Sequence, residues 1–338
     1  MHAYVHKYLN AAHMHACTMQ TMPTAREALG AATKIVADTG DLDSIKALAP
    51  VDATTNPSLI LAAVSDPKFA ALVDEAIKSA KGATTEEKVT DATDRLAVAF
   101  GTEITKLVPG YVSTEVDARL SYDVEGTIAK AHKIIELYKE KGIDKSRILI
   151  KIASTYEGIK AAEVLEKEGI TCNMTLLFNF HQAIFAAQAK ATLISPFVGR
   201  ILDYYKANNK DIVYTHETDP GVLSVRQIYN YYKKHGHETI VMGASFRSVG
   251  EVLALCGCDR LTISPALINE MDKMTDAVPV TMSAEAAKKM DIPVVVVDEK
   301  MFRWEMNQDP MANEKLAEGI RKFAADLDKL EAIVKGKL

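Results

Sequence analysis

The chain has 338 residues, of which 48% are hydrophobic and 25% charged, as is ordinary for a globular protein. Its 40 basic and 45 acidic residues give a net charge of −5, so no general attraction to nucleic acid or to an anionic membrane is expected. No stretch reaches the roughly 18 uninterrupted apolar residues of a membrane helix. An anionic substrate would therefore have to be held by local arginines.

Residues 1–25 are predicted to form a mobile extension in front of a single domain over 26–338. They contain no acidic residue, one Lys and no Arg, which is too little positive charge for a transit peptide. Their four histidines are irregularly spaced, so a metal site is not expected there.

The four cysteines are too few for a disulfide framework in a chain of this length, so we expect them to be buried and reduced, as in the cytoplasm. The C-terminal Gly336-Lys337-Leu338 weakly resembles a peroxisomal address, which leaves a peroxisome-like organelle as the alternative location.

The body of the chain alternates short apolar or β-branched runs with segments of helical periodicity. One helix is predicted from Asp66-Pro67 to Gly82, and Thr84-x-x-Glu87 is a capping-box start for the next. Later apolar stripes lead to Gly142, Gly169, Gly236 and Gly257, residues suited to left-handed C-caps. The predicted strands are 34–38, 52–55, 111–116, 147–153, 170–176, 192–197, 239–244 and 260–264.

Eight successive strand–helix units predict an α/β fold, a closed (β/α)8 TIM barrel, because parallel neighbours need helical crossovers. No G-x-G-x-x-G follows a strand and no G-x-x-x-x-G-K-[ST] occurs, which removes the main nucleotide-binding classes. A further helix is predicted over 312–335, after Asp309-Pro310. Its apolar stripe must pack either against its own barrel or against a second subunit. The stripe consists of Leu316, Ile320, Phe323, Leu327, Leu330 and Val334.

Charged residues gather at the C-terminal ends of the predicted strands, where barrels of this kind carry their active sites. Lys151 lies in the apolar run ILIKIA, and burial disfavours its ammonium form, leaving an amine that can act as a nucleophile. Asp38 and Glu115 follow neighbouring strands and favour this catalytic interpretation over a structural ion pair. Each also has a simpler alternative, since Asp38 could cap a helix and Glu115 could pair with Arg119 on the surface.

Polar residues without charge follow other strands. Asn56 precedes Pro57 and could be no more than a turn into a helix. Asn173 and Thr175 alternate in one run and therefore point to the same side of their strand, which indicates the barrel interior.

Arg200 and Arg247 follow successive strands at glycine-containing turns, and Ser195 and Ser245 lie close to them in the sequence. Backbone N–H groups at a helix start and a forked guanidinium together suit a phosphate group. Surface salt bridges are the alternative interpretation of these two arginines.

From about Thr33 to Leu338, these residues and the motifs around them make the chain resemble the classical transaldolases. Those proteins are class I Schiff-base enzymes of the pentose phosphate pathway. The resemblance implies transfer of a dihydroxyacetone unit from sedoheptulose 7-phosphate or fructose 6-phosphate to glyceraldehyde 3-phosphate or erythrose 4-phosphate. It implies no metal and no organic cofactor, and a homodimer through the C-terminal helix. The motifs that carry it are VADTGD at 36–41, DATTNPSLI at 52–60, STEVDARLSYD at 113–123, ILIKIAST at 148–155, ISPFVGRILDYYKAN at 194–208, VMGASFRSVGE at 241–251 and NQDPMA at 307–312.

The same resemblance implies the residue roles. Lys151 would form the Schiff base, Asp38 would be the acid and base at the C4 hydroxyl of the donor, and Glu115 with Thr175 would hold the water used in proton transfer. Substrate binding would fall to Asn56, Asn173, Ser195, Phe197, Arg200, Ser245 and Arg247.

Two other functions stay open at this point. A fructose 6-phosphate aldolase would release free dihydroxyacetone, but the pattern of those relatives has Gln in place of Glu115 and Tyr in place of Phe197. A barrel that binds sugar phosphates without catalysis is the second alternative, and the intact Lys151, Asp38 and Glu115 set argues against it.

Overall fold

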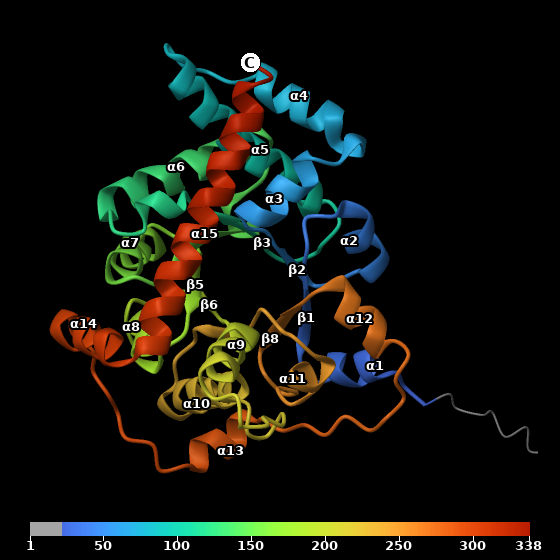
Figure 1. Ribbon diagram of the computed structural model, residues 1–338, viewed down its shortest axis with the longest axis vertical. Helices are drawn as coiled ribbons and strands as arrows, with labels where there is room; N and C mark the ends of the chain where they lie inside the picture. Colours follow the sequence, from blue (N-terminus) through green and yellow to red (C-terminus); the bar gives the residue numbers. More distant parts are fainter. Residues whose placement is uncertain (1–21) are drawn as a thin grey trace, which may run out of the picture.

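The computed structural model describes residues 22–338 as a closed barrel of eight parallel strands surrounded by helices (Figure 1). Each strand pairs with its successor in the chain, and β8 returns to pair with β1. This arrangement confirms the predicted (β/α)8 barrel, and every strand overlaps its predicted run. The strands are β1 Lys34–Asp38, β2 Asp52–Thr54, β3 Val112–Glu115, β4 Ile148–Ala153, β5 Cys172–Leu177, β6 Leu193–Pro196, β7 Ile240–Gly243 and β8 Arg260–Ile263.

Fifteen α-helices and three short 3-10 helices, η1 to η3, connect and cover the strands in the described part of the chain. Among residues 22–338, no helix combines the length and the hydropathy that a bilayer span requires. The α-helices are α1 Ala25–Gly30, α2 Leu42–Leu48, α3 Pro57–Val64, α4 Ala70–Lys78, α5 Thr85–Thr105, α6 Val124–Glu140, α7 Tyr156–Lys167, α8 Phe180–Gln188, α9 Val198–Asn208, α10 Pro220–His235, α11 Val249–Leu253, α12 Pro265–Met271, α13 Ala284–Lys289, α14 Glu299–Gln308 and α15 Pro310–Lys335; the 3-10 helices are η1 Pro67–Phe69, η2 Ala118–Leu120 and η3 Lys145–Arg147.

Helix ends follow the local sequence signals at most of the predicted points. Thr84 and Glu87 form the reciprocal capping box that begins α5. Gly142, Gly169 and Gly236 all have positive φ angles, as a left-handed helix terminator requires.

The helix predicted over 66–82 is shorter and begins differently. Its first turn is the 3-10 helix η1, and α4 ends at Lys78 with its C-cap at Ser79. The backbone N–H of Lys81 donates to the Asp91 carboxylate of α5 at 2.8 Å, which takes the chain out of the helix before Gly82.

The chain joins the fold earlier than the predicted boundary after residue 25. Thr24 and Glu27 form a capping box at the start of α1, and Ala25 is completely buried. The N–H of Ala25 also donates to the carbonyl of Met274 at 2.7 Å. The rest of the predicted extension, residues 1–21, lies outside the described residues.

Helix α15 runs across the barrel from α14 towards α4, as Figure 1 shows. It begins at Pro310 rather than at 312, because Asp309 caps it by accepting from the N–H of Ala312. All six residues of its predicted apolar stripe are buried within this chain. The stripe therefore packs against its own barrel, and a partner subunit could use only the outer face of the helix.

Candidate active site

Lys151 and Glu115 form a buried ion pair inside the barrel. The two residues lie side by side in the register of β3 and β4. Lys151 Nζ lies 3.3 Å from Glu115 Oε2 and donates to the carbonyl of Thr55 at 3.1 Å. The alternative pairing of Glu115 with Arg119 is not found, because Arg119 binds carboxylates on η2 and α15 instead.

Asp38 lies at the end of β1 and accepts from Thr54 Oγ1 at 3.2 Å. The alternative role considered for Asp38 was that of a helix cap, but Asp41 is the residue that caps α2. Burial raises the pKa of Asp38 and that of Glu115, and the positive charge of Lys151 only partly opposes this. Two buried carboxyls with raised pKa values are thus suited to accept and return protons beside one amine.

A hydrogen-bonded chain of neutral groups lies next to this pair. Ser195 Oγ donates to Asn173 Oδ1 at 2.8 Å, and Asn173 Nδ2 donates to Ser113 Oγ at 3.1 Å. Thr175 is fully buried, and its Oγ1 has no hydrogen-bond partner among the described residues. The predicted pair Asn173 and Thr175 thus supplies one fixed amide and one hydroxyl that is free to bind a small ligand or a water.

The pocket at the C-terminal ends of the strands brings most of the predicted residues together. Asn56 has both of the roles considered for it, since it caps α3 by accepting from Leu59 N and also lines this pocket. Glu115, Thr175 and Arg247 lie outside the lining. The predicted residues that line it are Asp38, Asn56, Lys151, Asn173, Ser195, Phe197, Arg200 and Ser245, and it is completed by Thr54, Met242, Ala244, Thr262 and Phe323.

Arg200 is held between two aromatic rings at the pocket wall. Its guanidinium carbon lies 4.6 Å from the ring centroid of Phe197 and 5.7 Å from that of Phe323. Burial lowers the pKa of Arg200, and the nearby charge of Arg247 lowers it further. The sequence placed Phe323 only in the stripe of the last helix, and no signal connected it with the pocket.

Arg247 makes an ion pair with Asp203 of α9 at 2.7 Å and lies 3.4 Å from Ser245 Oγ. The Arg247 side chain is 41% exposed, so it stays accessible to an anion. Arg200 in the first turn of α9, after β6, and Arg247 on the loop after β7 are thus close enough to influence each other.

Gly199, also in the first turn of α9, allows this helix to approach the loop after β7 closely. Its N–H donates to the carbonyl of Ser245 at 2.9 Å, and an added Cβ would lie 2.5 Å from that oxygen and 2.6 Å from Arg247 Cγ. Ser245 itself has a φ of 60°, in the left-handed region. The loop geometry therefore requires glycine at 199 and a strained backbone at 245.

Comparison with known proteins shows the family to which the chain is similar. The family model described as Transaldolase/Fructose-6-phosphate aldolase matches residues 35–334. The chain is 58% identical over 308 residues to a transaldolase of Alteromonas mediterranea, covering 90% of this chain and 96% of the relative. It is 56% identical over 319 residues to a transaldolase of Actinobacillus succinogenes, covering 94% and 100%. It is also 58% identical over 306 residues to a probable transaldolase of Drosophila melanogaster, covering 90% and 92%.

Proposed function

The chain belongs to the transaldolase/fructose-6-phosphate aldolase family, and we propose that it transfers a dihydroxyacetone unit between sugar phosphates from a Schiff base on Lys151. Transaldolase activity, a lysine Schiff base and a place in the pentose phosphate pathway follow from this membership. The observation that supports the assignment of Lys151 is that it lines the pocket while buried beside two carboxyls, Asp38 and Glu115.

The reaction begins when the Lys151 amine adds to the ketone of the donor. Loss of one water gives a protonated imine, which withdraws electrons from the neighbouring carbons. Asp38 accepts the proton of the C4 hydroxyl, the C3–C4 bond breaks, and an aldose phosphate leaves. The enamine that stays on Lys151 then attacks an acceptor aldehyde, and hydrolysis frees the new ketose.

Glu115 and Thr175 hold the water and the proton that imine formation and hydrolysis need. Thr175 Oγ1 is buried and unpartnered among residues 22–338, so it is free to bind this water. The raised pKa of Glu115, caused by burial, suits a group that gains and loses a proton within one turnover.

Donor hydroxyls fit the amide and hydroxyl chain of Asn56, Asn173 and Ser195. Arg200, Ser245 and Arg247 bind the phosphate, where Asp203 orients Arg247. We propose sedoheptulose 7-phosphate or fructose 6-phosphate as donor and glyceraldehyde 3-phosphate or erythrose 4-phosphate as acceptor.

Borohydride trapping tests this function. The protein is incubated with fructose 6-phosphate, reduced with borohydride and mapped by peptide mass spectrometry. We expect a three-carbon adduct on Lys151 and no free dihydroxyacetone without an acceptor. Adduct on another lysine would refute the assignment of Lys151, and steady release of dihydroxyacetone would identify an aldolase instead.

We also propose a cytoplasmic location and a homodimer in which α15 takes part. The buried thiols Cys172, Cys256 and Cys258 support a reducing compartment, while Cys17 lies outside the described residues. Lys337, within the peptide considered as a peroxisomal address, is paired with Asp74 at 2.9 Å. The dimer would involve the outer, polar face of α15, and light scattering measures its mass.

A further inference from the structure

A second cavity lies behind the active-site pocket, between α3, α5, α6 and α15 at the end of β3, and we call it the rear chamber. Glu115 and Asn56 form its inner wall, and Ile60, Ala97 and Leu330 are among its apolar residues. Its volume is about 50 Å³. At roughly 10–15 Å³ for each water centre, it has room for about three to five waters.

The Lys151–Glu115 ion pair separates the rear chamber from the pocket. Lys151 lines the pocket and Glu115 lines the rear chamber, although their charged atoms are only 3.3 Å apart. Asn56 borders both spaces. Lys151, which would form the imine, is thus reached from the pocket, and Glu115, which would hold the proton, is reached from the rear chamber.

The Glu115 carboxylate lies between Lys151 and the rear chamber, and one of its oxygens lacks a hydrogen-bond partner in the described part of the chain. The Glu115 side chain is 4% exposed, and its Oε2 has no hydrogen-bond partner among residues 22–338. The contact with Lys151 has the distance of an ion pair without the geometry of a hydrogen bond. A buried carboxylate with one oxygen in this state is costly unless water binds its other oxygen.

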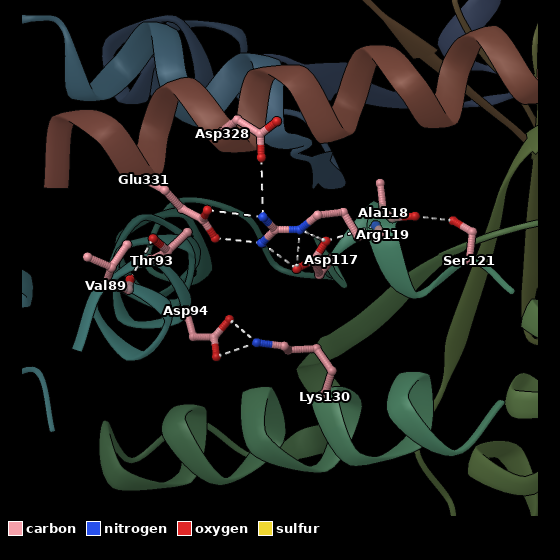
Figure 2. Close-up of polar contacts among 10 residues, drawn as sticks. All are labelled: Val89, Thr93, Asp94, Asp117, Ala118, Arg119, Ser121, Lys130, Asp328 and Glu331. Atoms are coloured by element: carbon pink, nitrogen blue, oxygen red, sulfur yellow. Dashed lines mark hydrogen bonds and ion pairs between the residues drawn. The ribbon is translucent and has the colours of Figure 1, made fainter. Parts of the chain in front are cut away.

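The rim of the rear chamber is polar and reaches the surface. Lys130 binds the Asp94 carboxylate at 2.7 and 2.9 Å on one flank, and Glu331 lies on the other, where it binds Arg119 (Figure 2). Thr90 at the outer edge is exposed. Water can therefore enter from bulk solvent past charged groups, without passing through the pocket.

We infer that the rear chamber is a water site that hydrates Glu115 and connects its proton to bulk solvent while a sugar phosphate fills the pocket. The inference rests on the proposed role of Glu115. When the Lys151 amine condenses with the donor ketone, a C–N bond forms, the C–O bond breaks and one water leaves; hydrolysis consumes one water and reverses these changes. Glu115 holds the transferred proton in both directions, and the rear chamber lets that proton equilibrate with solvent.

The test measures the pKa of Glu115 directly. Protein labelled with carboxyl-¹³C glutamate is titrated by NMR, and the Glu115 signal is identified by its loss in Glu115→Gln. Ala97→Phe fills the rear chamber, so we expect the midpoint of Glu115 to rise by about one unit or more, because lost hydration disfavours the carboxylate. Ala97→Ser keeps the space and should titrate like the unsubstituted chain.

Ala62→Phe is the matched control, because Ala62 is exposed on α3 outside the rear chamber. It should leave the midpoint unchanged. If Ala97→Phe does not fold, the smaller Ala97→Leu should shift the midpoint in the same direction. A folded Ala97→Phe or Ala97→Leu with an unchanged midpoint would overturn the inference, as would an equal shift in Ala62→Phe.

Borohydride labelling of each variant separates this inference from the proposed function. Labelling of Lys151 with an unchanged Glu115 midpoint would reject the rear chamber alone. A shifted midpoint without any labelling would reject the Schiff base and leave the hydration of Glu115 in place.

Discussion

Phe323→Leu should weaken phosphate binding without unfolding the protein. Phe323 is 1% exposed on α15, and its ring faces the Arg200 guanidinium opposite Phe197. Leucine keeps an apolar side chain there but removes the aromatic face. A cation–π contact is worth about 0.5–2 kcal/mol, which converts to a loss of roughly two- to thirtyfold in kcat/KM at 1.4 kcal/mol per factor of ten.

The assay compares glyceraldehyde 3-phosphate with unphosphorylated glyceraldehyde as acceptor. The loss should be confined to the phosphorylated acceptor, since the role proposed for Arg200 is to bind the phosphate. Phe100→Leu is the matched control: Phe100 is completely buried in a second core, where it packs on Phe69 at 5.2 Å. Both variants remove a similar volume, so their melting temperatures should fall by similar amounts.

Two outcomes would refute the reasoning. An unchanged preference for the phosphorylated acceptor in Phe323→Leu would show that the ring does not position Arg200. An equal loss in Phe100→Leu would show that the effect is a general consequence of weaker packing.

Lys151→Met should abolish the borohydride adduct and raise the pKa of Glu115 further, because the lysine charge now lowers it. The variant should be most stable in acid. Its stability should fall as the pH rises from the pKa of Glu115 in the unfolded chain through its raised pKa in the folded protein. The same dependence of melting temperature on pH in Lys151→Met and in the unsubstituted chain would contradict this. Arg247→Ala should reduce kcat/KM for glyceraldehyde 3-phosphate roughly ten- to a hundredfold, since a charged hydrogen bond is worth about 1.5–3 kcal/mol, and affect glyceraldehyde far less. Equal losses on both acceptors would make Arg247 a structural residue. Deletion of residues 312–338 should cost roughly 1.5–3 kcal/mol for each large buried side chain of α15; unchanged melting and scattering mass would mean that α15 belongs neither to the core nor to an interface.

The barrel could be predicted because its signals are local. Each strand is a short apolar run, and glycines such as Gly142 and Gly236 mark helix ends with positive φ angles. Once parallel strands are assumed, their C-terminal ends meet on one face, which brings Asp38, Lys151 and Asn173 into one pocket without further information.

Contacts between distant segments could not be predicted in this way. The apolar period of α15 shows that Phe323 is buried, but not that it meets Arg200, because periodicity identifies a face and never its partner. The pairing of Arg247 with Asp203 joins the loop after β7 to helix α9 and depends on the close approach at Gly199, which only the assembled backbone reveals. The same holds for the rear chamber, whose wall at Leu330 comes from the far end of the chain.

The position of α15 at the end of the element order also determines when its contacts can form during translation. All eight strands precede it in the chain, so the ribosome can deliver a complete barrel before this helix exists. A nascent barrel would already hold Lys151, Asp38 and the contact of Arg200 with Phe197, yet it would lack Phe323 and the part of the rear-chamber wall that α15 supplies. Phe323 and Leu330 arrive last and dock on segments translated long before. The contact of Arg200 with Phe323 therefore forms only after the segment that carries α15 has been translated.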